Sequence, residues 1–165
     1  MKFFEEIPVG DRYEVGRHTF TAAEIKAFAR RFDPQPFHLD EAAAARSQFG
    51  ALCASGWHTA TLWMRLVLDY RRRESEARRA RGEANASGGP APGFRDLQWL
   101  KPVYADDTVS YWAEILDKRT SNSRPGWGLV SIRTTGVNQR GETVISFVST
   151  TFIERRAAAA SASAP

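Results

Sequence analysis

The sequence contains a single cysteine, Cys53, so neither an intramolecular disulfide nor a cysteine-based metal cluster can form. Its three histidines are each 20 residues from the next, a spacing that matches no known metal-binding pattern. A chain with one thiol suits a reducing compartment. We therefore expect a cytoplasmic protein that holds no metal.

Long hydrophobic runs are also missing. The most apolar stretch is interrupted by Arg65 and Asp69, which makes it too short and too charged to cross a bilayer. The first ten residues, MKFFEEIPVG, include two glutamates where a secretory signal needs an apolar run. These absences predict a protein that is neither secreted nor embedded in a membrane.

The charge balance is mildly basic, because 23 lysines and arginines face 19 aspartates and glutamates. Nucleic-acid binding is not favoured, since no basic–aromatic motif accompanies the arginine clusters at 71–73 and 78–81. A positive surface equally suits a ligand with several phosphates, such as coenzyme A. The length predicts one domain over residues 1–156, with a mobile loop at about 74–93 and a disordered Ala/Ser tail at 157–165.

Hydrophobic periodicity and turn residues predict a strand, then helices, then an antiparallel meander. Thr21 and Glu24 form a capping-box pattern, so a helix should begin at Ala22. This helix should end at Asp33, because Pro34 follows. Further elements are predicted as a short helix at 40–46, strands at 13–20, 94–103, 108–117, 128–137 and 143–153, and a hairpin turn at 138–141.

The segment from Trp57 to Tyr70 is apolar nearly all round, which predicts a central helix buried on most sides. Arg65 and Asp69, four residues apart, would form its one polar stripe. Residues 71–92 then change to arginines, glycines and prolines, which predict a frayed helix end and a loop. One sheet packed on one long helix leaves a sheet edge uncovered, so we expect at least a dimer.

Asp33 and His38 flank two prolines, which fix φ and remove backbone donors. The segment Asp33-Pro-Gln-Pro cannot be helix interior, so both titratable side chains should lie on a rigid, non-helical turn. The preceding helix ends at Asp33, and its dipole should raise the pKa of this carboxyl modestly. Gly56 begins the central helix and offers a free N–H. A carboxylate, an imidazole and such a donor suit proton transfer beside a carbonyl group.

Three motifs in the same order over residues 10–155 resemble the MaoC-like dehydratases, the R-specific enoyl-CoA hydratases of the hot-dog fold. The family pattern Asp-x-Asn-Pro-aliphatic-His is matched from Asp33 to His38. Gln35 replaces the asparagine and Phe37 the aliphatic residue. The other two motifs are the small residue–glycine pair that opens the central helix, here Ser55-Gly56, and Lys101-Pro102-Val103 followed by Asp106-Asp107-Thr108.

The resemblance implies an α+β hot-dog fold, an antiparallel sheet wrapped around a long central helix. It implies reversible hydration of a trans-2-enoyl-CoA to an (R)-3-hydroxyacyl-CoA by a homodimer or higher homo-oligomer, with no cofactor beyond the coenzyme A of the substrate. Asp33 and His38 would act through one bound water, and which of them is acid and which is base stays open. The Gly56 N–H would stabilise the enolate oxygen. Substrate contacts would come from Ser55, Trp57 and Gln35.

Two other functions stay open. One is a hot-dog acyl-CoA thioesterase, in which a carboxylate activates water against the thioester carbonyl. The Asp–His pair speaks against it, because thioesterases of this fold generally use a lone carboxylate elsewhere. The other is a non-catalytic acyl-binding module, which the departures at Gln35 and Ser55 keep open. Gly56 could serve close packing alone, and His58 is expected in the core or at a dimer face.

Overall fold

The computed structural model describes residues 1–156, so the tail predicted at 157–165 lies outside the described residues. The predicted order of a strand, helices and four further strands is confirmed, but only the last three of these strands form a meander, because the strand at 93–99 pairs with the last strand. The elements are η1 (Phe4–Glu6), β1 (Arg12–Thr19), α1 (Ala22–Phe32), α2 (Pro36–Leu39), α3 (Glu41–Ala45), α4 (Gly56–Ala80), β2 (Gly93–Trp99), β3 (Thr108–Thr120), β4 (Trp127–Asn138) and β5 (Thr143–Glu154).

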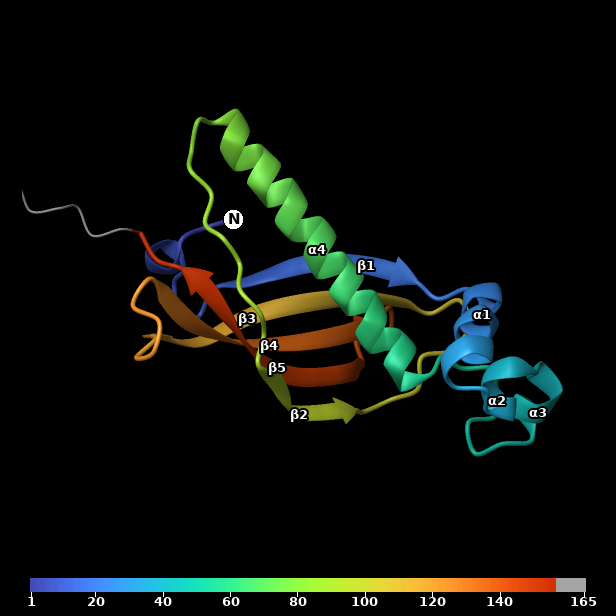
Figure 1. The fold of residues 1–165 in the computed structure, drawn as a ribbon. Coiled ribbons are helices and arrows are strands. Elements are labelled where there is room, and N and C mark those ends of the chain that lie inside the picture. The colour runs from blue at the N-terminus through green and yellow to red at the C-terminus, as the bar shows by residue number, and fades with distance from the viewer. Residues whose placement is uncertain (157–165) are drawn as a thin grey trace, which may run out of the picture.

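The strands form one antiparallel sheet in the order β1-β3-β4-β5-β2. Helix α4 lies across one face of this sheet, while α1, α2 and α3 gather at one end of it (Figure 1). The short connection between β4 and β5 is the predicted hairpin, in which Gly141 adopts φ 78° and its N–H donates to the Asn138 carbonyl. The α+β hot-dog arrangement is thus confirmed.

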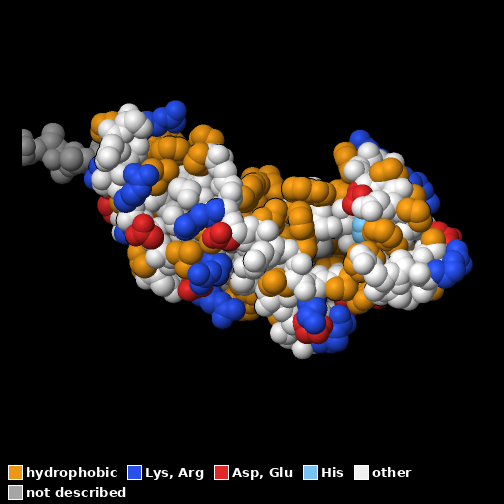
Figure 2. All heavy atoms as spheres, turned by 90° about the horizontal axis from the view of Figure 1, so that it is seen from below, with side chains coloured by type: hydrophobic (Ala, Val, Ile, Leu, Met, Phe, Trp, Pro, Cys, Tyr) orange, Lys and Arg blue, Asp and Glu red, His pale blue; other side chains and the backbone are white. Residues whose placement is uncertain are grey.

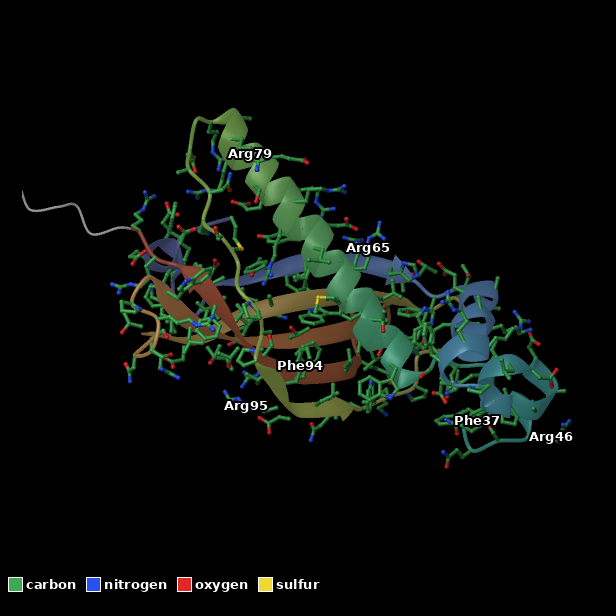
Figure 3. All side chains as sticks on the ribbon, in the orientation of Figure 1. Phe37, Arg46, Arg65, Arg79, Phe94 and Arg95 are labelled. Carbon is green, nitrogen blue, oxygen red and sulfur yellow. The ribbon has the colours of Figure 1, made fainter. Side chains whose placement is uncertain are left out.

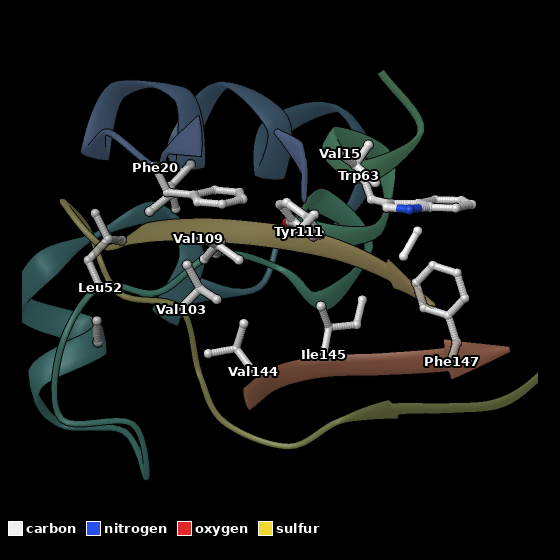
Figure 4. Packing of buried hydrophobic residues seen from close by; sticks show 14 residues of the cluster. Val15, Phe20, Leu52, Trp63, Val103, Val109, Tyr111, Val144, Ile145 and Phe147 are labelled. Carbon is white, nitrogen blue, oxygen red and sulfur yellow. The ribbon is translucent and has the colours of Figure 1, made fainter. Parts of the chain in front are cut away.

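The main core lies between α4, α1 and the inner face of the sheet (Figure 4). Strand β3 shows why, because its side chains alternate between buried and partly exposed positions from Thr108 to Ile115. The largest fully buried side chains of the core are Tyr111, Phe20 and Phe147. A smaller cluster packs around Phe4 at the other end of the sheet.

The capping box predicted for α1 is present. The Thr21 hydroxyl accepts from the Glu24 N–H, and the Glu24 carboxylate accepts from the Thr21 N–H. The helix ends at Phe32, and Asp33 is its C-cap residue. The expectation of a wholly non-helical turn after it is wrong in part, because Pro36 occupies the first position of a one-turn helix that carries His38.

Helix α4 continues ten residues beyond Tyr70, the end of the predicted apolar segment, which corrects the prediction of a loop from about residue 74. The reason is a buried charge at its end. Arg78 is 5% exposed and pairs with Glu6 at 3.1 Å and with Glu83 at 3.2 Å, and it also donates to the Ala84 carbonyl. These contacts hold the last helical turns against η1 and against the segment that follows α4.

The prediction that α4 is buried on most sides is also wrong for a single chain. Trp57, Met64 and Leu68 are all exposed along it. The predicted polar stripe is present, since the Arg65 guanidinium pairs with Asp69 at 3.1 Å, and Arg65 and Arg79 lie along the exposed side of the helix (Figure 3). No helix within residues 1–156 is long and apolar enough to cross a membrane.

Candidate active site

A cleft of about 410 Å³ opens where the α2 segment, the start of α4 and the segment after β2 meet. Asp33, His38 and Lys101 are the side chains along it that can carry a charge near neutral pH, and the buried thiol of Cys53 also lines it. Its walls include four aromatic residues, Phe37, Phe49, Trp57 and Trp99. Every site residue proposed from the sequence lines this one cleft: Asp33, Gln35, His38, Ser55, Gly56 and Trp57.

Asp33 and His38 face each other within the cleft. The His38 Nε2 atom lies 3.5 Å from the Asp33 Oδ2 atom. The other ring nitrogen, Nδ1, lies 2.7 Å from the Cys53 carbonyl oxygen. A carbonyl can only accept, so Nδ1 carries a proton and the neutral ring has its lone pair on Nε2. The imidazole is 94% buried at the side chain, which keeps this orientation fixed.

The pKa of Asp33 is lowered, so the prediction of a modest rise from the helix dipole is wrong. Burial is the largest influence and would raise it, but three others together outweigh burial. They are hydrogen bonds from the Ser55 hydroxyl and from the Gln35 amide, the latter 2.8 Å long, and the charge of His38. Asp33 is therefore an ionised hydrogen-bond acceptor at neutral pH.

Gly56 is the first residue of α4, and Ser55 is the N-cap, with its hydroxyl accepting from the Trp57 N–H at 3.3 Å. No hydrogen bond between described residues uses the Gly56 N–H, so this donor stays available at the positive end of the helix. Packing also demands glycine here. A Cβ atom at position 56 would lie 2.6 Å from the Trp99 indole.

Two of the proposed substrate contacts have a further structural role. Gln35 binds the Asp33 carboxylate, and Ser55 is 1% exposed beneath the same carboxylate. Trp57, in contrast, is 58% exposed and meets Trp99 edge-on with ring centroids 5.0 Å apart. Trp57 therefore forms an accessible wall of the cleft, whereas Gln35 and Ser55 hold the carboxylate in place.

Sequence reasoning missed three contributors to the site: Trp99, Lys101 and the carbonyl of Cys53. Trp99 ends strand β2 and shapes the cleft beside Gly56, and no local pattern connects two positions so far apart. Lys101 was noted only as part of a motif. The Cys53 carbonyl belongs to the main chain, so its role has no residue-type signal. Cys53 itself is a buried thiol whose pKa burial raises to about 11.

His58 was expected either in the core or at a dimer face, and it lies in the core. Its ring stacks on Phe28 with centroids 4.5 Å apart and meets Phe20 edge-on at 5.1 Å. The residue is 4% exposed, and its Nδ1 atom has no hydrogen-bond partner among the described residues. Burial lowers the pKa of His58 from 6.5 to about 4.

This burial predicts a pH-dependent stability. As the pH falls below 6.5 the unfolded state binds a proton at His58, while the folded state does so only near pH 4. The free energy of unfolding should therefore decrease between these values, by about 3 kcal/mol, and then level off. Urea unfolding at several pH values measures it. A His58→Phe variant should lose this dependence, and a His18→Gln variant should keep it; equal slopes in all three proteins would contradict the assignment.

The comparison with known families shows to which family this chain belongs. A sequence model described as "MaoC like domain" matches residues 5–135. The chain belongs to this MaoC-like family. A MaoC-like dehydratase from Rhodospirillum rubrum is 37% identical and superposes with a TM-score of 0.78, over 96% of this chain and all of that one.

The MaoC-like chain is also similar to two hydratases. Mesaconyl-CoA hydratase of Cereibacter sphaeroides is 38% identical over 73 residues, which are 44% of this chain. The matched residues cover 21% of that hydratase, about a fifth of its length. An (R)-hydratase from A. caviae involved in PHA biosynthesis shares the fold with a TM-score of 0.64, at 22% identity over 89% of this chain and 97% of that one.

Proposed function

We propose that this MaoC-like protein is a hydro-lyase that adds water reversibly to a trans-2-enoyl-CoA to give an (R)-3-hydroxyacyl-CoA. The observation that carries the proposal is the pairing of two hydrogen-bond acceptors, the His38 Nε2 lone pair and the Asp33 carboxylate, 3.5 Å apart at the wall of an open cleft. The names of the R. rubrum and C. sphaeroides relatives support this reaction class.

The two acceptors suit one water molecule. Water has two hydrogens, so it can donate one to His38 Nε2 and the other to Asp33. A carboxylate is ordinarily a weaker base than an imidazole, and the pKa of Asp33 is lowered below its usual value. We therefore assign proton removal to His38, whereas Asp33 orients the water and stabilises the imidazolium that forms.

The water oxygen then bonds to the β-carbon of the enoyl group while its proton passes to Nε2. The electrons of the carbon–carbon double bond move toward the carbonyl group, and negative charge collects on the thioester oxygen as an enolate. The unused Gly56 N–H at the start of α4 would stabilise this charge, helped by the helix dipole. The imidazolium finally returns the proton to the α-carbon, so that one water is added and no cofactor is consumed.

The cleft charge suits a thioester of a phosphorylated carrier. Lys101 lies at the cleft beside aromatic walls, and a cation there would attract the phosphates of coenzyme A. The carrier could equally be an acyl carrier protein, because its phosphopantetheine arm presents the same thioester and a phosphate. Separate assays with the two carriers distinguish them.

A second copy of the chain is the partner that we propose for the uncovered apolar surface. Met64 and Leu68 are exposed on α4, and Phe94 is exposed on the edge strand β2, where its ring meets Trp63 of α4 edge-on with centroids 5.9 Å apart. Seen from the β2 side, hydrophobic side chains gather across a hollow in the middle of the molecule (Figure 2). Pairing two such surfaces would bury α4 on the side that a single chain leaves open. Sedimentation velocity of the purified protein tests this dimer.

The test of the activity is a spectrophotometric assay with crotonyl-CoA. Hydration removes the conjugated enoyl-thioester absorbance without releasing free thiol, and a thiol reagent in a parallel sample measures any hydrolysis. Loss of the absorbance with no thiol is the expected result. Release of thiol would instead establish a thioesterase. Inactivity toward short, long and branched enoyl thioesters of both carriers would favour an acyl-binding module.

A further inference from the structure

Asp107 is a buried carboxylate that lies outside the cleft and joins two segments of the chain. It is 3% exposed and does not line the cleft. Its oxygens accept from the Arg140 guanidinium at 2.7 and 3.2 Å, from the Gln139 amide at 2.7 Å and from the Tyr104 N–H at 2.9 Å. Burial would raise the pKa of Asp107, but these hydrogen bonds and the charge of Arg140 together lower it. An ionised Asp107 therefore links the turn between β4 and β5 to the segment that contains Tyr104.

Tyr104 in turn lies opposite Cys53 in a short antiparallel pairing. The two hydrogen bonds of this pairing are made by the flanking residues, from the Ala54 N–H to the Val103 carbonyl at 2.7 Å and from the Ala105 N–H to the Leu52 carbonyl at 3.1 Å. In such a pair the backbone N–H and C=O groups of the two opposed residues point away from each other. The Tyr104 N–H accordingly binds Asp107, while the Cys53 carbonyl oxygen lies 2.7 Å from His38 Nδ1.

The position of the Cys53 carbonyl governs which nitrogen of the neutral His38 ring carries the proton. Two acceptors compete for that proton, namely this carbonyl beside Nδ1 and the Asp33 carboxylate, 3.5 Å from Nε2. If the carbonyl moved away from Nδ1, the proton would shift to Nε2, where it faces the carboxylate. His38 would then have no lone pair on Nε2 to accept a proton from water.

We propose that Asp107 and Arg140 are positioning residues for His38, because they hold the Tyr104 segment whose pairing keeps the Cys53 carbonyl beside Nδ1. The inference rests on the proposed role of His38 as the base. Neither Asp107 nor Arg140 lines the cleft, so both act through the imidazole and not on the substrate. Their loss should therefore change kcat much more than KM.

The direct test is nitrogen-15 NMR of the histidine rings, which distinguishes a protonated from an unprotonated ring nitrogen. Spectra are recorded at a pH at which the His38 ring is neutral, and its signals are assigned by their absence from His38→Ala. The wild-type protein should carry the proton on Nδ1. Asp107→Asn keeps the shape of the side chain but loses the charge that binds Arg140, so a large share of the protons should move to Nε2.

Two further variants test the same link without removing the buried group. The Arg140 side chain is 47% exposed, so Arg140→Met should fold. It should shift the proton toward Nε2 to a smaller extent than Asp107→Asn, since Gln139 and Tyr104 still bind the carboxylate. Glu142→Gln is the matched control, because it removes the other carboxylate that pairs with Arg140 and leaves Asp107 intact. Its ring proton should stay on Nδ1.

Glu6→Gln controls for a general loss of stability. It removes a carboxylate that pairs with a buried arginine, Arg78, at the other end of the sheet, and it should leave the His38 proton on Nδ1. A wild-type proton pattern in both Asp107→Asn and Arg140→Met would overturn the proposal. The same shift in Glu6→Gln would also overturn it, because the effect would then not pass through the Tyr104 segment. Thermal unfolding of every variant verifies that it is folded.

The kinetic counterpart is measured with crotonyl-CoA. Asp107→Asn should lower kcat about tenfold while KM stays within about twofold of the wild-type value. A rise in KM at unchanged kcat would contradict a positioning role. The NMR result needs no substrate, so the position of the ring proton is settled whether or not the protein hydrates crotonyl-CoA, and the two proposals fail separately.

Discussion

Replacing His38 by alanine is expected to lower kcat/KM for the hydration of crotonyl-CoA by about 10²–10⁴-fold. Among the described residues that line the cleft, the imidazole alone combines a lone pair facing Asp33 with an orientation fixed by a main-chain carbonyl. Alanine removes the proton acceptor and leaves the rest of the cleft in place. Initial rates at low substrate concentration measure the ratio.

Asp33→Asn provides the matched comparison. Asparagine keeps the shape of the side chain but cannot stabilise an imidazolium, so a loss of similar order is expected. Because both residues act on one water, the double variant should be little worse than the worse single variant. Independent, multiplying losses would contradict a shared water. Full activity in Asp33→Asn would remove this residue from the mechanism.

Gly56→Ala should also reduce turnover strongly, by about 10²–10³-fold in kcat, through the loss of an aligned oxyanion donor. The added methyl group would lie 2.6 Å from the Trp99 indole, so either the start of α4 or the indole must move. A shift at the helix start turns the Gly56 N–H away from the developing charge. The effect should therefore appear in kcat more than in KM.

A second substitution tests whether the clash is the cause. In the background of Trp99→Ala the methyl group at position 56 has space, so Gly56→Ala should then cost much less than it does in the wild-type protein. An equal loss in both backgrounds would show that the effect does not pass through Trp99. The activity of Trp99→Ala alone provides the reference for this comparison.

The parts of the site that could be predicted from the sequence are those set by local chain geometry. Asp33 and His38 are five residues apart, and the intervening prolines restrict the backbone enough to bring both side chains to one place. Gly56 follows an N-cap serine, so its place at a helix start was readable as well. These three residues do line one cleft.

The parts that could not be predicted depend on contacts between distant segments. Trp99 reaches Gly56 only after β2 takes its position at the edge of the sheet. The sign of the pKa shift at Asp33 was missed because it depends on hydrogen bonds from Ser55 and Gln35 rather than on the helix dipole alone. The length of α4 was missed because the helical segment around Arg78 has no apolar periodicity that predicts a helix. This segment is held instead by the ion pair between Arg78 and Glu6, which lies 72 residues away in the sequence.

The close hydrogen bond from His38 Nδ1 to position 53 goes to the backbone carbonyl at 2.7 Å, whereas the cysteine sulfur lies at a longer 3.8 Å. Every amino acid supplies the same carbonyl, so the tautomer of the imidazole does not depend on which residue evolution places at 53. Side chains of similar size can therefore replace one another there while the proton on Nδ1 stays where it is. The histidine itself has no such freedom, because its two nitrogens serve two different partners.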